Sequence, residues 1–100
     1  MKLVVENNSW NAIRTGREFM PLEDKNFILS YLKGNTNMAY SSGYIIDVVT
    51  NRETDISLRG YCENGFMWTS DDIYHFEKYN LPFIPEFLKY IRRKIQSKTA

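Results

Sequence analysis

The spacing of apolar positions changes from a helical period to a strand period in the middle of the chain. Residues 44–49 form a run of aromatic and β-branched side chains, and residues 56–63 alternate between apolar and polar. Both patterns predict β-strands. The Asn64-Gly65 pair that follows supplies the two positive φ angles of a tight hairpin turn, and residues 66–68 complete a third strand. The middle of the chain therefore predicts a three-stranded antiparallel meander.

Two helices are predicted on the N-terminal side of the meander, after a short extended segment at residues 3–5. Ser9 is the expected N-cap of a helix over residues 10–19, although an internal glycine lowers its helix propensity by about 1 kcal/mol. A second helix is expected over residues 21–33, because Pro21 suits a first turn and its apolar residues recur at helical spacing.

Two further helices are predicted on the C-terminal side. Thr69 or Ser70 is expected to cap the first, with Asp72 in the capping-box position. An Asn-Leu-Pro sequence ends that helix, and Pro85 begins the last one. Its basic tail, residues 96–100, is expected to fray. All 100 residues are thus expected to form one α+β domain, a three-stranded antiparallel meander packed by N-terminal and C-terminal helices.

The composition agrees with a single packed domain. The chain is 43% apolar and 15% aromatic, well above the composition of disordered chains. Its one cysteine, Cys62, cannot form an intramolecular disulfide or a cysteine-based zinc site. The N-terminal sequence lacks the apolar core of a signal peptide, and no apolar run approaches the roughly 20 residues of a membrane span. We expect a cytoplasmic protein that does not associate with membranes.

Charge is unevenly distributed although the net charge is only +1. Residues 43–77 carry two arginines against seven acidic residues, whereas residues 78–100 carry six basic residues against one acidic residue. One interpretation is an acidic surface for a basic partner and a basic tail for an acidic one. The other is that each run is a solvated face, with the terminal basic residues placed favourably at a helix C-terminus.

Few residues suggest chemistry. Asp71 lies one helical turn before His75, an arrangement that can orient an imidazole for acid-base work, but no nucleophile, second base or glycine-rich loop accompanies the pair. We expect His75 at the surface or boundary. Asp71 and Asp72 are explained by helix capping rather than by metal binding, and Cys62 falls on the inward side of its strand as a small buried residue. The sequence therefore predicts no enzyme, metal site or cofactor.

The aromatic residues around the hairpin have two explanations. They could stack nucleic-acid bases, but they lie in the acidic segment, which repels phosphates. We expect them instead to pack between the sheet and the last two helices, with some remaining at the surface for a protein partner. A nucleic-acid module using the basic tail is a further alternative. The residues in question are Tyr61, Phe66, Trp68, Tyr74, Phe76 and Tyr79 in the cluster and Arg92, Arg93, Lys94 and Lys98 in the tail.

A pattern over about a quarter of the chain resembles the C-terminal part of small bacterial immunity proteins of polymorphic or contact-dependent toxin systems. It comprises a turn glycine, a strand tryptophan, a helix with paired aromatic residues and an Asn break, and then a Leu-Pro and a Pro-Glu-Phe sequence before the final helix. These residues are Gly65, Trp68, Tyr74, Tyr79, Asn80, Leu81, Pro82, Pro85, Glu86 and Phe87.

This resemblance implies an inhibitor that occludes a cognate toxin, with a basic toxin or nuclease as its partner. Carboxylates would pair with the cations that hold phosphates, and aromatic side chains would fill a groove. A phage-encoded inhibitor of a host defence system and a non-inhibitory adaptor subunit are the alternatives. The expected contact residues are Asp47, Glu53, Asp55, Tyr61, Glu63, Trp68 and Tyr74.

Overall fold

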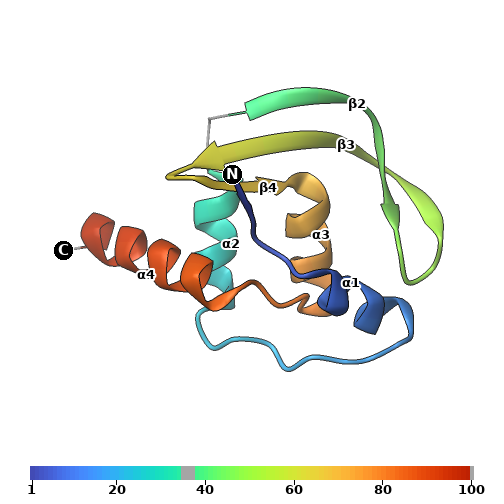
Figure 1. The fold of residues 1–100 in the computed structure, drawn as a ribbon, viewed down its shortest axis with the longest axis horizontal. Coiled ribbons are helices and arrows are strands. Elements are labelled where there is room, and N and C mark those ends of the chain that lie inside the picture. Colours follow the sequence, from blue (N-terminus) through green and yellow to red (C-terminus); the bar gives the residue numbers. More distant parts are fainter. Residues whose placement is uncertain (35–37, 100) are drawn as a thin grey trace.

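The computed structural model describes residues 1–34 and 38–99 and shows a four-stranded sheet and four helices (Figure 1). The elements, in chain order, are β1 (Lys2–Leu3), α1 (Asn7–Arg14), α2 (Lys25–Lys33), β2 (Met38–Asp47), β3 (Arg52–Glu63), β4 (Phe66–Thr69), α3 (Ser70–Tyr79) and α4 (Pro85–Thr99).

The sheet has the strand order β1-β4-β3-β2. The three predicted strands are present and antiparallel, but the N-terminal segment adds a fourth, parallel strand in which Lys2 is paired with Phe66. The sheet is therefore mixed, and the prediction of a pure antiparallel meander was incomplete. A strand of two residues has no period to read in the sequence, and its pairing joins segments more than 60 residues apart.

Both long strands extend beyond their predicted ranges, and the turn between them is displaced. β2 ends at Asp47 instead of continuing through Val49, because the Asp47 carboxylate draws the next backbone N–H groups into a turn. β3 begins at Arg52, so the polar NRETD segment is mostly strand and not loop. Asn51 closes the turn with a φ of 58°, a conformation that asparagine tolerates better than most residues.

The N-terminal helices are shorter than predicted. α1 begins after Glu6, which makes no side-chain cap, and not at Ser9. It ends at Arg14, two residues before Gly16, whose φ is +89°. α2 begins at Lys25, so Pro21 lies in the connecting segment. That segment is held by a tertiary contact, since the side chain of Asn80 donates a hydrogen bond to the Phe19 carbonyl.

The C-terminal half agrees closely with the sequence-based expectation. Thr69 and Asp72 form a reciprocal capping box at the start of α3, and Asn80 ends that helix in the left-handed conformation. α4 begins at Pro85 as predicted and continues to Thr99, so it includes residues 96–99 of the segment expected to fray. Asn64 and Gly65 both have positive φ, as the predicted hairpin turn requires.

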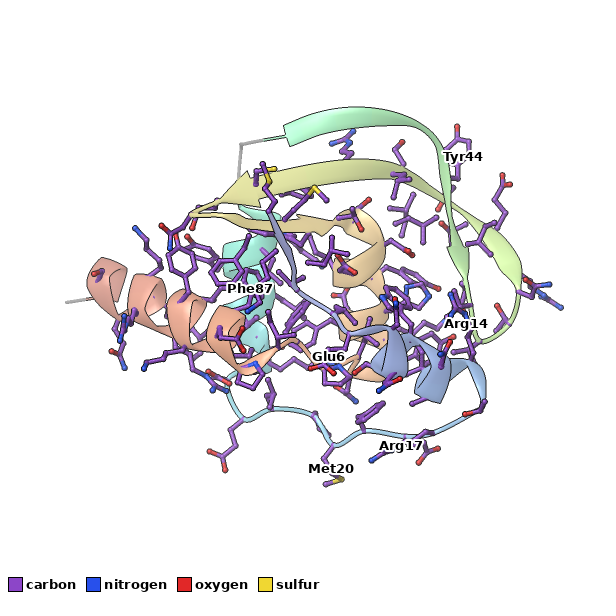
Figure 2. All side chains as sticks on the ribbon, viewed as in Figure 1. Glu6, Arg14, Arg17, Met20, Tyr44 and Phe87 are labelled. Atoms are coloured by element: carbon purple, nitrogen blue, oxygen red, sulfur yellow. The ribbon has the colours of Figure 1, made fainter. Side chains whose placement is uncertain are left out.

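The core lies between the sheet and the helices and combines aliphatic side chains with a cluster of aromatic rings (Figure 2). Trp68 stacks on Tyr61 and contacts Phe87 of α4, and Phe87 in turn meets Phe83. The expected packing of the hairpin rings against the last helices is thus confirmed for these residues. Among the described helices, none has the length and apolar character needed to cross a membrane.

Candidate protein-binding surface

The distal part of the β2–β3 hairpin, residues 44–57, is called here the arm. It continues past the end of β4 and curves so that its tip lies beside α1 and α3 (Figure 1). Gly43, with a φ of +105°, and two register shifts between β2 and β3 accompany this curvature. The arm is therefore positioned by contacts at its tip as well as by its own strand pairing.

Asp47 is the centre of the contacts at the tip. Only 2% of its surface is exposed. One carboxylate oxygen accepts hydrogen bonds from the N–H groups of Val49 and Thr50 at 2.9 and 3.0 Å. The other accepts from the hydroxyls of Tyr74 and Tyr79 on α3 at 2.7 and 2.6 Å. A single carboxylate thus shapes the turn of the arm and joins it to α3.

These bonds stabilise the charged form of Asp47. Burial on its own would raise the pKa of this carboxyl, but the two tyrosine hydroxyls and the backbone N–H groups outweigh it and hold the pKa well below its usual range. The same contact acts oppositely on the phenols, since burial and the hydrogen bond to Asp47 raise the pKa of Tyr79 to about 12. Lys78 lies 3.5 Å from the carboxylate and supplies a nearby positive charge.

His75 makes the second connection between α3 and the arm. The expectation that it lies at the surface or boundary was wrong, because its side chain is fully buried. Its Nε2 accepts the N–H of Val48 at 3.1 Å, and its Nδ1 lies 2.8 Å from the Asp71 carbonyl, which fits a proton on Nδ1. The ring also packs edge-on against Trp10 of α1. Nε2 therefore bonds the arm, while Nδ1 bonds within α3 and fixes the orientation of the ring.

The outer face of the arm carries exposed apolar side chains. Tyr44 and Ile46 are 54% and 50% exposed, and they flank the buried Ile45. Since side chains alternate along a strand, both lie on the face opposite Ile45, together with their cross-strand partners Ser57 and Glu53. Figure 2 shows Tyr44 pointing away from the helices. We call Tyr44, Ile46, Glu53 and Ser57 the arm face.

The structure divides the predicted contact residues into exposed and enclosed ones. Glu53 and Asp55 are exposed on the arm, as a binding role requires. Asp47, Tyr61 and Trp68 are buried, so their side chains are not available to a partner in this conformation. Tyr74 is partly buried with its hydroxyl bound to Asp47. The acidic and aromatic residues were predicted from the sequence alone; the contacts of Asp47 with α3 and the packing of Tyr61 and Trp68 in the core decided that these are enclosed.

The side chain of Glu63 is also bound within the domain. Its carboxylate accepts hydrogen bonds from the hydroxyls of Tyr31 on α2 and Tyr90 on α4. Burial, followed by the Glu63 carboxylate, raises the pKa of Tyr90 to about 12. This contact joins the end of β3 to two helices, and it makes Glu63 a structural residue rather than part of a charged surface.

The acidic run of residues 43–77 consequently does not form one continuous patch. Asp72 caps α3, and Glu77 forms a salt bridge with Lys33. In the basic run, Arg92 donates two hydrogen bonds, of 2.8 and 3.1 Å, to Asp24, the residue that precedes α2. Much of the charge segregation in the sequence is therefore used in contacts between elements.

The other candidate residues do not assemble into a reactive site. Cys62 is half-buried beside Met1, with 3.4 Å between the sulfur atoms, whereas its neighbour Tyr61 points inward, so the predicted phase of that strand was wrong at this position. In the part of the chain that the structure describes, no three His, Cys, Asp or Glu side chains gather as metal ligands would.

A cavity of about 330 Å³ lies between the tip of the arm and the C-terminal ends of α1 and α3. Its charged lining residues are Arg17, Glu18 and Lys78, and Ile13 and Phe19 contribute apolar surface. The guanidinium of Arg17 lies 4.9 Å from the Phe19 ring centroid.

Comparison of the chain with protein-family models, with curated proteins and with solved structures finds no match. The arm face therefore has to be interpreted from its own geometry. Sequence reasoning did not single out Tyr44 and Ile46, because a continuous apolar run does not reveal which of its two faces will be buried.

Proposed function

We propose that the protein is a small binding domain that inhibits a basic protein partner, and that the arm face is its contact surface. One observation carries this proposal. Exposed Tyr44 and Ile46 lie on the same hairpin as the exposed carboxylates of Glu53 and Asp55, and the tip of that hairpin is bonded to α3. Apolar anchors beside charged groups are the usual composition of an interface that excludes water at its centre and selects partners at its rim.

The way the arm is held supports an inhibitory role. The bonds of Asp47 and His75 join the tip to α3, so the arm face is presented without the entropy cost of ordering a mobile loop. An inhibitor needs no reactive group of its own; it has only to cover the surface through which its target works. The partner class is that expected of an immunity protein: a toxin, in particular a nuclease whose cationic groups hold phosphates.

The first experiment uses charge reversal. Glu53→Lys with Asp55→Lys should weaken association with the partner about tenfold or more, mainly by slowing the on-rate, and binding by the wild-type protein should weaken as salt is raised, because exposed charges are screened beyond about 10 Å at 0.1 M salt. Glu63 is left unchanged because it is bound to two tyrosines. The matched control is Glu18→Lys with Glu23→Lys, which makes the same charge change on exposed residues outside the arm.

Partner identity and interface are tested together. The tagged wild-type chain, the arm variant and the control variant are each used to capture proteins from the native host. A basic protein recovered with wild type and control, but not with the arm variant, is then purified, and its activity is measured with and without the chain. Equal recovery by all three baits would refute the arm face as the contact surface, and full activity of the bound partner would refute inhibition.

A further inference from the structure

One edge of the sheet is long and uncovered. The strand order places β2 at the edge, and Figure 1 shows no element of the described chain beyond it. The opposite edge is β1, which is only two residues long. β2 has ten residues, so it presents a row of backbone N–H and C=O groups along its outer side. Such a row is a template for pairing with another strand.

The neighbouring strand β3, in contrast, is protected where β4 ends. Beyond the end of β4, the hydroxyl of Ser70 accepts the N–H of Arg59 and donates to the carbonyl of Ser57, so a side chain replaces the missing strand beside β3. β2 has no comparable protection in its sequence, MAYSSGYIID, which contains no lysine, arginine or proline. Its only charged residue, Asp47, lies at the end of the strand and is buried. Natural edge strands are normally blunted by such residues.

The directions of the backbone groups can be assigned near the arm. The Ile45 carbonyl accepts a hydrogen bond from the hydroxyl of Thr54 on β3 at 2.8 Å, so the backbone groups of Ile45 face β3. Because successive residues of a strand direct their backbone groups to opposite sides, the N–H groups of Tyr44 and Ile46 point outward from the edge. These two groups are available to a further strand.

We propose that β2 pairs with β2 of a second copy of the chain in antiparallel orientation, which joins the two four-stranded sheets into one continuous sheet. The arrangement has two-fold symmetry, so each copy contributes the same strand and the contact closes on itself. This inference does not rest on the proposed inhibitory function, because the edge of the arm and its outer face are different surfaces.

Charge along the arm favours a second copy in this orientation. Near the tip, Glu53, Asp55 and the ionised Asp47 outnumber Arg52, whereas Arg59 lies toward the base of the hairpin. Antiparallel pairing sets the tip of one arm beside the base of the other, so opposite charges approach. It also sends the two Asp47 residues to opposite ends of the strand pair. A parallel arrangement would bring like charges together.

The main test measures mass and exchange on the full chain. Light scattering should give twice the monomer mass of 11.9 kDa at concentrations on the order of 100 μM. In that dimer, amide exchange of Tyr44 and Ile46 should be slowed at least tenfold relative to a dilute sample, because each N–H acquires an acceptor. A monomer at that concentration overturns the proposal and leaves the edge to a strand of a different protein. A dimer in which both amides exchange as fast as in the dilute protein also overturns it.

Two variants complete the test. Ile46→Pro removes an outward N–H group, so it should weaken dimerisation at least tenfold. Ile46→Lys keeps the N–H but places a charged side chain on the edge strand, where it would lie beside the paired strand, and it should also weaken dimerisation. The control is Met20→Lys, which replaces an exposed apolar residue in the segment between α1 and α2. A folded Ile46→Pro protein that dimerises like wild type refutes the proposal; if it does not fold, the exchange of the wild-type amides decides.

Discussion

At the scale of single residues, the most informative side chains are polar groups enclosed by the fold. Asp47 and His75 are both buried, and each bonds the tip of the arm to α3. Leaving such groups without partners costs about 1–3 kcal/mol each, so their bonds have a larger effect on stability than surface charges do. Residue type in the sequence did not distinguish Asp47 from the exposed acids Glu53 and Asp55; only their positions on a curved hairpin did.

The Asp47 contact can be tested through the tyrosine that it binds. Asp47→Asn removes the negative charge, so the pKa of Tyr79, raised to about 12 by burial and by Asp47, should fall toward the ordinary value of about 10, with the contribution of burial remaining. The free energy of unfolding should fall by about 1–3 kcal/mol. Phenolate absorbance during an alkaline titration and urea unfolding measure the two effects.

Tyr79→Phe serves as the assignment control, since its titration should lose one phenol from the transition near pH 12, to which Tyr90 still contributes. If the tyrosine titration of Asp47→Asn matches that of the wild type, the carboxylate is not what holds the phenol protonated.

At the scale of elements, α3 is the helix whose start is set most directly by its own side chains, which form a capping box. The side-chain oxygen of Thr69 accepts the N–H of Asp72, and the Asp72 carboxylate accepts the N–H of Thr69 at 2.9 Å. Burial nevertheless raises the pKa of Asp72 to about 6. The cap therefore satisfies the backbone of the helix while its charge is disfavoured by the surroundings.

Because burial disfavours the charged form of Asp72, the free energy of unfolding should depend on pH. The pKa of Asp72 is higher in the folded protein than its value of 3.8 in the unfolded chain, so the fold binds this proton more tightly. The stabilisation that this proton gives the fold is complete below a pH of about 4 and is lost as the pH rises through about 6. Between pH 7 and 5, the wild type should gain about 1–2 kcal/mol from this group, out of about 3 kcal/mol for the whole shift. Asp72→Asn, which keeps an acceptor for the Thr69 N–H, should lack this gain.

Urea unfolding at several pH values measures the difference between the two proteins. Glu23→Gln, a change at an exposed acid before α2, is the control and should follow the wild-type pH profile. Identical pH profiles for wild type and Asp72→Asn would mean that burial does not perturb this carboxyl.

At the scale of the whole molecule, the N-terminal segment joins the sheet to the C-terminal helix. β1 pairs with β4, and the Val4 carbonyl accepts the N–H of Ile84 just before α4 at 2.8 Å. Lys2 forms an ion pair with Glu86 in the first turn of α4. The first residues of the chain therefore contact the start of α4 and belong to the folded structure.

Substitutions at two neighbouring residues test whether the N-terminal segment packs in this way. Val4 is 1% exposed and Leu3 is 61% exposed. Val4→Ala should lower the free energy of unfolding by about 2 kcal/mol, because two buried methyl groups are removed and a cavity remains, whereas Leu3→Ala should change it by no more than about 0.5 kcal/mol. Denaturant unfolding compares them. Equal effects of the two substitutions would show that the N-terminal strand is not docked as described.

The sequence by itself determined the elements whose signals are local. The capping box at Thr69, the positive-φ turn at Asn64-Gly65 and the start of α4 at Pro85 each depend on residues within a few positions of one another. Such signals act through the backbone nearby and need no distant partner. The α+β class and the three central strands followed from these signals together with the spacing of apolar residues along the chain.

Only the tertiary structure decided which side chains are enclosed and which are presented. Burial of His75, the parallel pairing of Lys2 with Phe66 and the exposure of Tyr44 all depend on contacts between segments far apart in the chain. A run of apolar residues in the sequence does not show which of its faces packs inward. An acidic residue in the sequence does not show whether its carboxylate will meet water or two tyrosine hydroxyls. The arm face and the open edge of β2 therefore became visible only when the sheet order and the curvature of the hairpin were known.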